Sequence, residues 1–434
     1  GIAPRVEEMQ YDISGRFIVQ TTNILGFKDK MNYDFNFGLL LSKTNYLNQT
    51  FSYTYDNWQK TTKETDFYNK EKLYYYEWIT GGDFINGIKM KVVSPTGATS
   101  ETYTDVWGRK RLERELSIND KWIDRRTEYD ILDRPYKKSD PYFSTNTATR
   151  WTISEFDEYG RGKKVTFPTG KVVTSTYNGL SSTVVDGQKT QTITNDAWGN
   201  RVKMVDNGGE INYTYFANGN LKSSNYGGHI VSIEQNGWGA KTKMSDPSVG
   251  GDYIYTYDNF GQILTEENPK GKTTYTYDVY GRLTRKRVLG HNTDIRVTYT
   301  YDSNGLLTSE AGTSNSIANS FTYEYDNYYR NNKKTESIAG ITIDKTYTFD
   351  DFGRVNTELT ETHSGLNVSS FKIENVYAAS GDLEKIKDFT TGTVIWTLNN
   401  INEKGQVLSS TLGNGVQVNN AYDSNYYLTS INHT

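Results

Sequence analysis

A short phrase of the form Tyr-x-Tyr-Asp-x-x-Gly recurs along the chain and constrains its fold more than any other feature. The clearest copy runs from Tyr275 to Gly281 and is followed by Arg282 and Leu283. In the most regular stretch the aspartates of successive copies lie 20 or 24 residues apart, at Asp258, Asp278, Asp302, Asp326 and Asp350. A fixed internal period of this length is the signature of a repeat protein.

Looser copies extend the repeat over the rest of the sequence. Their markers are Asp12, Asp34, Asp56, Asp105, Asp130, Asp157, Asp196 and Asp423, with degenerate copies at 216–219, 236–239, 378–381 and 402–405. The wide gap after Asp56 predicts a diverged unit near Gly81-Gly82-Asp83. With about 18 units and no linker, residues 1–434 are predicted to form one continuous repeat region, not the two or three domains usual for this length.

Each unit is predicted to be a β-hairpin. Aromatic and polar residues alternate from Tyr275 to Tyr277, which is the period of a half-buried strand. Asp278 suits the first position of a type I turn because its carboxylate accepts nearby backbone N–H groups. Gly281 can adopt the left-handed conformation that closes a bulged hairpin. A unit then supplies two strands of about 7–9 residues, and the chain is predicted to be an all-β array of stacked antiparallel hairpins.

The width of such an array predicts its shape. About 36 strands at roughly 4.8 Å each would make a sheet on the order of 170 Å wide. A twisted sheet cannot stay open and flat at that width. We therefore expect the sheet to spiral and to enclose a hollow.

The composition supports aromatic strands and excludes other classes. Aromatic residues make up 14 % of the chain, with 35 Tyr, although hydrophobic residues make up only 35 % and the mean hydropathy is −0.73. A disordered chain lacks such aromatic content, and a coiled coil is rich in Ala, Leu, Glu and Lys. The absence of Cys excludes disulfides, thiolate metal sites and cysteine nucleophiles.

Charge and hydropathy exclude two kinds of partner. The net charge is −4, and the densest basic run, 109–111, is followed closely by Glu113 and Glu115, which argues against nucleic-acid binding. No apolar run approaches the roughly 18 residues that a membrane helix needs. The N-terminal segment has no apolar stretch typical of a signal peptide.

No residue stands out as catalytic, cofactor-binding or metal-ligating. The Tyr-Asp pairs recur at every turn, which favours a structural role over acid–base chemistry, and one Asp per turn is too few for Ca²⁺. The four histidines lack the spacing of a zinc site; they are His229, His291, His363 and His433. No G-x-S-x-G elbow or phosphate-binding loop is present. The chain is predicted to be a non-enzyme without cofactor or metal.

The phrase from Tyr275 to Leu283 resembles the YD repeat of the Rhs family, and the resemblance extends from Tyr11 to Tyr427. That family includes bacterial polymorphic-toxin shells, the C component of insecticidal Tc toxins, and the teneurins. The resemblance implies a strip of hairpins that spirals into a hollow cocoon around a toxic C-terminal polypeptide. It also implies contacts with secretion machinery or with other shell segments, and a location outside the cell or at its surface.

Two departures from the family pattern limit what is carried over. Complete shells end in a plug region with an Asp-Pro-x-Gly motif, whereas Asp140-Pro141 and Asp246-Pro247 lack the following Gly. The sequence stops within a repeat at Thr434, with no toxin or plug domain visible, so a fragment, a processed portion and the ordered part of a larger protein stay open. Self-cleavage is therefore assigned to no residue.

The sequence thus predicts a shell that encapsulates a toxin or another polypeptide for secretion and delivery. The alternative is a secreted or cell-surface adhesin whose aromatic array is a binding scaffold. A polysaccharide-degrading enzyme on a repeat scaffold is the weakest reading because no catalytic cluster is visible.

Overall fold

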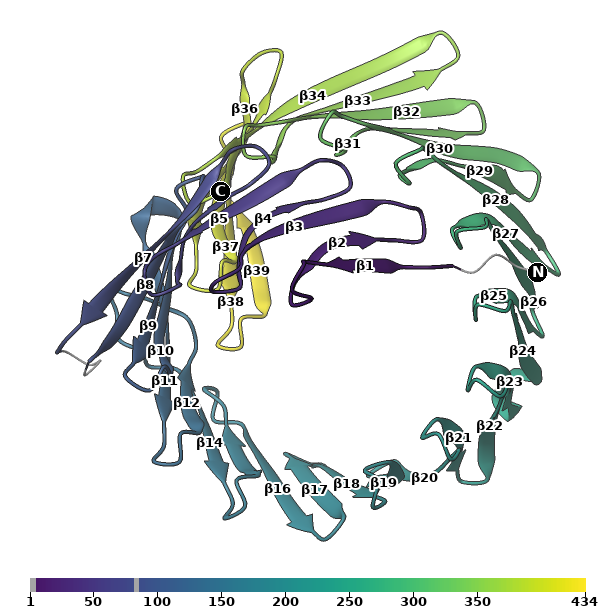
Figure 1. The fold of residues 1–434 in the computed structure, drawn as a ribbon, viewed down its shortest axis with the longest axis horizontal. Helices are drawn as coiled ribbons and strands as arrows, with labels where there is room; N and C mark the ends of the chain where they lie inside the picture. Colours follow the sequence, from purple (N-terminus) through teal and green to yellow (C-terminus); the bar gives the residue numbers. More distant parts are fainter. Residues whose placement is uncertain (1–4, 82–85) are drawn as a thin grey trace. The chain divides into compact units, whose positions relative to one another are not determined.

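The computed structural model describes residues 5–81 and 86–434, which form an almost unbroken succession of β-strands (Figure 1). The first strands are β1 (Glu8–Tyr11), β2 (Ile18–Thr22), β3 (Lys28–Asp34), β4 (Leu39–Thr44), β5 (Thr50–Tyr55), β6 (Thr61–Thr65), β7 (Glu71–Ile79), β8 (Gly87–Val93), β9 (Thr99–Asp105), β10 (Lys110–Leu116), β11 (Trp122–Tyr129), β12 (Pro135–Ser139) and β13 (Tyr142–Phe143).

The middle of the chain continues in the same way. Its strands are β14 (Trp151–Phe156), β15 (Gly162–Thr166), β16 (Val172–Asn178), β17 (Ser181–Asp186), β18 (Lys189–Asn195), β19 (Arg201–Asp206), β20 (Gly209–Tyr215), β21 (Leu221–Tyr226), β22 (His229–Gln235), β23 (Lys241–Asp246), β24 (Gly251–Tyr257), β25 (Ile263–Asn268), β26 (Gly271–Tyr277), β27 (Leu283–Gly290) and β28 (Thr293–Tyr301).

The C-terminal strands complete the series and include the longest of the described strands, with 11 residues. They are β29 (Leu307–Ser314), β30 (Ile317–Tyr325), β31 (Asn331–Ile338), β32 (Ile341–Phe349), β33 (Val355–Ser364), β34 (Asn367–Tyr377), β35 (Leu383–Asp388), β36 (Val394–Ile401), β37 (Val407–Leu412), β38 (Gln417–Tyr422) and β39 (Leu428–His433). The two helical segments among the described residues are single 3-10 turns, η1 (Ile118–Asp120) and η2 (Pro247–Val249). Neither is long and apolar enough to cross a membrane.

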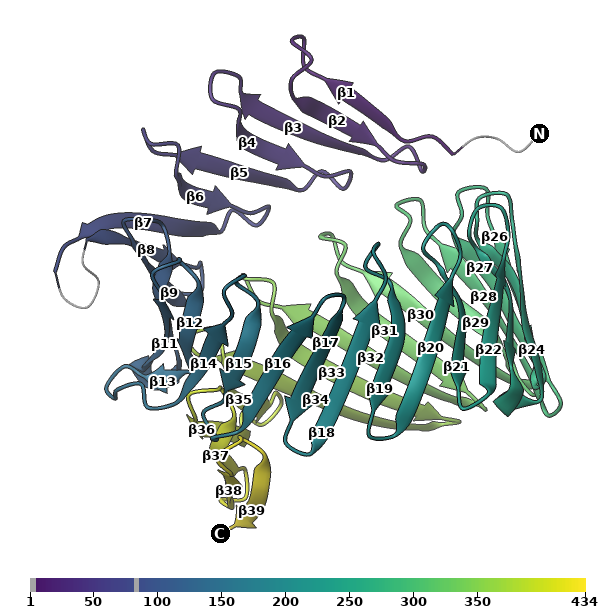
Figure 2. The ribbon, with the colours of Figure 1, turned by 90° about the horizontal axis from the view of Figure 1, so that it is seen from below.

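Strands that follow one another in the sequence pair antiparallel, as Figure 2 shows for β15 to β22. In the β26–β27 hairpin Gly271 faces Gly290, and the register shifts by one residue beside Tyr277, at a β-bulge next to the turn. The same bulge recurs in other hairpins of the repeat. The all-β array of antiparallel hairpins is confirmed, with 39 strands in the described residues. Gly82 and Asp83, where a diverged unit was expected, lie outside the described residues.

The chain divides into two compact units. Unit 1 comprises Gly1–Thr152, Tyr323–Thr335 and Ile341–Thr434. Unit 2 comprises Ile153–Thr322 and Glu336–Gly340. Unit 2 is therefore close to one uninterrupted run of hairpins, whereas unit 1 brings together segments that are far apart in the sequence.

Little of the chain is deeply buried. The buried hydrophobic side chains among the described residues are Leu112, Ile118 and Ile123, all in or between β10 and β11 of unit 1. Here β11 pairs with β10 on one side and with both β12 and β13 on the other, which departs from the simple succession of hairpins. Elsewhere most side chains of the sheet are half-buried or exposed, which explains the low hydrophobic fraction of the sequence.

Candidate functional site

The Asp-x-x-Gly turn recurs along the chain, and the copy at Asp278 shows how it is built. Its Oδ1 accepts the backbone N–H of Tyr280 at 3.0 Å and that of Arg282 at 2.9 Å. Its Oδ2 accepts the Nε–H of Arg282 at 2.7 Å. Gly281 has a φ of 89° and donates its N–H to the carbonyl of Asp278. The turn expected from the sequence is therefore confirmed.

These contacts keep the turn aspartates ionised. Burial raises the pKa of Asp278, but the hydrogen bonds from the side chain and backbone of Arg282 outweigh it, and the pKa lies below its usual value. The pKa values of Asp326 and Asp350 are lowered in the same way. Because both oxygens of Asp278 already accept hydrogen bonds, the carboxylate has little capacity left for proton transfer or for holding a cation.

The left-handed turn position is not always glycine. Gln59, for example, has a φ of 63° and donates its N–H to the carbonyl of Asp56, as Gly281 does to Asp278. Other non-glycine residues at the equivalent position include Asn69, Asp133, Tyr329 and Tyr426. The left-handed conformation costs an L-residue roughly 1–2 kcal/mol, so these turns are held by the Asp hydrogen bonds against local strain.

The second tyrosine of the motif links each hairpin to the one before it. The hydroxyl of Tyr277 donates to the carbonyl of Ile263, and that of Tyr301 to the carbonyl of Leu283, each at 2.9 Å. Burial raises the pKa of both tyrosines. The bond is made by Tyr55, Tyr129, Tyr177, Tyr215, Tyr257, Tyr277, Tyr301, Tyr377 and Tyr422. The sequence predicted an aromatic layer but not this hydrogen bond.

The arginine after the turn adds a second link. The guanidinium of Arg282 lies 4.7 Å from the ring centre of Tyr301 in the following hairpin. The guanidinium of Arg354 lies 4.2 Å from the ring centre of Tyr377. A cation over an aromatic face is attracted by the ring quadrupole. In these two copies the motif thus connects a turn carboxylate, an arginine and the tyrosine of the next unit.

In unit 1, turns that are distant in the sequence are in contact. The rings of Tyr68 and Tyr328 lie 4.7 Å apart, and the side-chain amide of Gln49 donates to the carbonyl of Tyr328 at 3.0 Å. The ammonium of Lys70 lies 3.7 Å from the carboxylate of Asp351. These contacts join turns of the N-terminal segment to turns of the C-terminal segment of the same unit.

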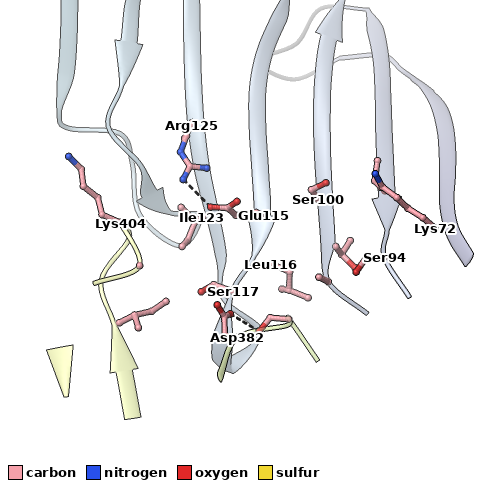
Figure 3. A pocket seen from close by; sticks show the side chains of 16 residues that line it. Lys72, Ser94, Ser100, Glu115, Leu116, Ser117, Ile123, Arg125, Asp382 and Lys404 are labelled. Carbon is pink, nitrogen blue, oxygen red and sulfur yellow. Dashed lines mark hydrogen bonds and ion pairs between the residues drawn. The ribbon is translucent and has the colours of Figure 1, made fainter. Parts of the chain in front are cut away.

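A cavity of about 410 Å³ also lies between these two segments of unit 1 (Figure 3). One side is formed by strands from β7 to β11, and the other by residues between β34 and β37 and the turn that precedes β37. The labelled lining residues are Lys72, Ser94, Ser100, Glu115, Leu116, Ser117, Ile123, Arg125, Asp382 and Lys404.

The polar groups of this cavity are largely paired with one another. Arg125 donates to Glu115 at 2.9 Å, and the hydroxyl of Ser380 donates to Asp382 at 2.7 Å. The ammonium of Lys404 lies 3.9 Å from the ring centre of Tyr426. The described lining contains no histidine, so no hydroxyl there has an imidazole base beside it. The cavity is therefore lined by polar groups from both segments of unit 1.

The four histidines lie at separate places along the sequence of strands. His229 begins β22, His433 ends β39, and His291 lies between β27 and β28. His363 lies on β33, where its Nε2 is 3.8 Å from a carboxylate oxygen of Asp344 on β32. Asp344, Glu361 and His363 form a group whose potential ligand atoms all lie within 4.8 Å of one another.

Spacing along the sequence could not reveal this group because its members come from two strands. The turn motif at Asp350 is the sequence feature from which this group could have been predicted. Once the turn at Asp350 fixes the register of the hairpin, Asp344 must face Glu361, and His363 must follow two residues later on the same face.

Comparison with known proteins agrees with the repeat. Residues 257–293 match the RHS Repeat family. No protein of curated function matches the sequence.

Solved structures share the fold over nearly the whole chain. The crystal structure of TcdB2-TccC3 is 14 % identical to this chain, with a TM-score of 0.59. The match covers 98 % of this chain and 27 % of the solved chain. The crystal structure of TcdB2-TccC3-Cdc42 and a structure of the Photorhabdus luminescens Tc holotoxin pore are each 13 % identical to this chain, with a TM-score of 0.61. Each match covers 98 % of this chain and 29 % of the solved chain.

At this identity the likeness shows the fold, and the chain spans less than a third of the length of the structures it matches. That fold, the RHS repeat match and the recurring Tyr-Asp-x-x-Gly hairpins agree with one another. The resemblance of the chain to the Rhs/YD-repeat family is confirmed.

Proposed function

We propose that this YD-repeat array is a non-catalytic wall that encloses a polypeptide cargo, such as a toxin domain, for export and delivery. The observation that carries the proposal is how the motif side chains are used. Asp278 closes its own turn, Arg282 reaches the next hairpin and Tyr277 reaches the preceding one. The motif side chains of this unit thereby serve to extend a sheet.

Such a sheet is suited to separating two compartments. Its strands are joined by backbone hydrogen bonds to a neighbour on both sides, so a polypeptide finds few free edges along it. Among the described residues its side chains are mostly half-buried or exposed, and the buried apolar ones are confined to β10, β11 and the segment between them. The fold match to structures named for a Tc toxin supports the same use. On this proposal the array acts outside the producing cell or at its surface, together with cargo, secretion machinery or further shell segments.

Electron microscopy of the full-length gene product tests the enclosure. We expect a hollow body, with the polypeptide that follows the array resistant to added protease until the array is denatured. A solid rod, or a following polypeptide that is cleaved at the same rate before and after denaturation, would contradict the proposal.

A second function, a binding scaffold of the adhesin type, is favoured by one observation. Aromatic side chains at several turn tips are largely in solvent, with exposed fractions of 84 % for Trp58, 89 % for Trp198 and 71 % for Trp238. Exposed Trp is enriched where proteins meet partners. Reading the gene beyond the codon for Thr434 separates the two functions, since a variable toxin domain supports the shell and a membrane or wall anchor supports the adhesin.

A further inference from the structure

The hairpin β32–β33 places two carboxylates directly opposite each other. Asp344 and Glu361 are cross-strand partners in the antiparallel register. Like charges in this position are destabilising. In the part of the chain that the structure describes, no lysine or arginine lies within ion-pair distance of Glu361. The ammonium of Lys333 offsets part of the charge of Asp344, whereas the charge of Glu361 is not offset in this way by the described residues.

The same hairpin shows that its sheet can match charges. On β32, Lys345 lies one residue nearer the turn than Asp344, and on β33, Glu358 lies three residues nearer the turn than Glu361. Lys345 and Glu358 form an ion pair of 3.3 Å. The opposition of Asp344 to Glu361 thus departs from the local pattern.

His363 supplies a third group of the kind that binds metals. It follows Glu361 by two residues and so lies on the same face of the sheet. The potential ligand atoms of Asp344, Glu361 and His363 all lie within 4.8 Å of one another. Ligands around a tetrahedral ion with bonds of about 2.0–2.2 Å are roughly 3.5 Å apart. Small rotations of half-exposed side chains bring the three groups to that spacing.

We propose that Asp344, Glu361 and His363 bind a divalent transition-metal ion such as Zn²⁺. One imidazole nitrogen with two carboxylates suits this class of ion, whereas Ca²⁺ requires six to eight oxygen ligands. Three protein ligands leave a position for water or for a further group. The site departs from the sequence-based expectation that the chain holds no metal.

Two neighbours on β31 shape the site. The hydroxyl of Thr335 donates to one oxygen of Asp344 at 2.5 Å and fixes the orientation of the carboxylate, as groups behind metal ligands commonly do. The ammonium of Lys333 lies 3.6 Å from the other oxygen and competes with a metal for it. Lys333 also lies 3.8 Å from Glu324, so it keeps an acidic partner when a metal ion takes its place at Asp344.

Titration calorimetry of the 434-residue chain with ZnCl₂ tests the site. We expect one Zn²⁺ per chain in the wild type, binding weaker by about tenfold or more in His363→Ala and Glu361→Gln, and no comparable binding of Ca²⁺. His291→Ala is the matched control, because this histidine lies between β27 and β28 and is not a member of the group, and the variant should bind Zn²⁺ as the wild type does.

A charge variant provides an independent measurement. Lys333→Met removes the competing ammonium and should bind Zn²⁺ more tightly, whereas weaker binding would overturn the assigned ligand set. Glu361→Gln preserves the shape of the side chain, so it decides the matter if His363→Ala does not fold. Absence of Zn²⁺ binding in the wild type, or equal affinity in the wild type and Glu361→Gln, overturns the proposal.

Discussion

The segment β9–β11 and the hairpins β24–β28 are held together in different ways. In β9–β11, Leu112 and Ile123 are each 3 % exposed, and the carboxylate of Asp124, equally buried, accepts two hydrogen bonds from Arg114. From β24 to β28 no side chain is buried, and the strands are joined by links such as that from Tyr277 to the preceding hairpin. The segment β9–β11 therefore has a small buried core, whereas the hairpins β24–β28 are joined by contacts between neighbouring hairpins without a buried core.

The difference follows from how the chain runs. A regular hairpin meets the same neighbour geometry as every other, so a hydroxyl and a guanidinium in fixed positions suffice to join it to the next. Around β11 the succession is broken, because this strand pairs with β10 on one side and with β12 and β13 on the other. Burial of apolar side chains stabilises the region where the repeat geometry does not apply.

The largest effect is expected for Asp124→Ala in the β9–β11 segment. Among the described residues, the change leaves the partly buried guanidinium of Arg114 with only Glu101, at 3.9 Å, as an ionic partner, so we expect a loss of roughly 3 kcal/mol. Urea denaturation measures the loss. The control is Asp294→Ala, because the ion pairs of Asp294 with Arg287 and Arg296 are exposed and should contribute little. Equal losses in the two variants would show that the β9–β11 segment has no special role in stability.

A smaller effect is expected for Gly281→Val in the β26–β27 hairpin. A β-branched residue in the left-handed conformation is strained by about 1–3 kcal/mol, so the melting temperature should fall. Gln59→Gly is the matched control, because it places glycine in a turn where an L-residue now has positive φ, and it should melt at or above the temperature of the wild type. A melting curve unchanged by Gly281→Val would refute the turn geometry.

The smallest effect is expected for Tyr277→Phe. The change removes one hydroxyl that donates to the carbonyl of Ile263 and keeps the ring, so the loss should be about 0.5–1.5 kcal/mol. Tyr255→Phe provides the comparison, since no hydrogen bond of that hydroxyl is found among the described residues. Denaturation curves that do not distinguish the two variants would show that the hydroxyl link contributes nothing to the array.

The sequence predicted those parts of the fold that depend on local signals. Asp278 and Gly281 define a turn within a few residues, and the alternation before it defines a strand, so the hairpin follows from the segment alone. The contact between Tyr68 and Tyr328 could not be predicted, because nothing near either residue indicates a partner about 260 positions away.

The group of Asp344, Glu361 and His363 could be predicted from the sequence only in part. Its members are close only after the hairpin is folded in the correct register, and that register follows from the turn at Asp350. Spacing between histidines, the usual indicator of a zinc site, carries no information when the other ligands are carboxylates on a neighbouring strand.

The tyrosine-to-carbonyl link has a consequence for how such chains evolve. Because Tyr277 and its counterparts donate to a carbonyl of the preceding hairpin, this link depends only on the immediate neighbour of each unit. Whole units can then be duplicated or deleted in genes while the remaining units keep their contacts. The length of the array becomes a trait that selection can adjust in increments of 20 or 24 residues, independently of any change in the motif itself.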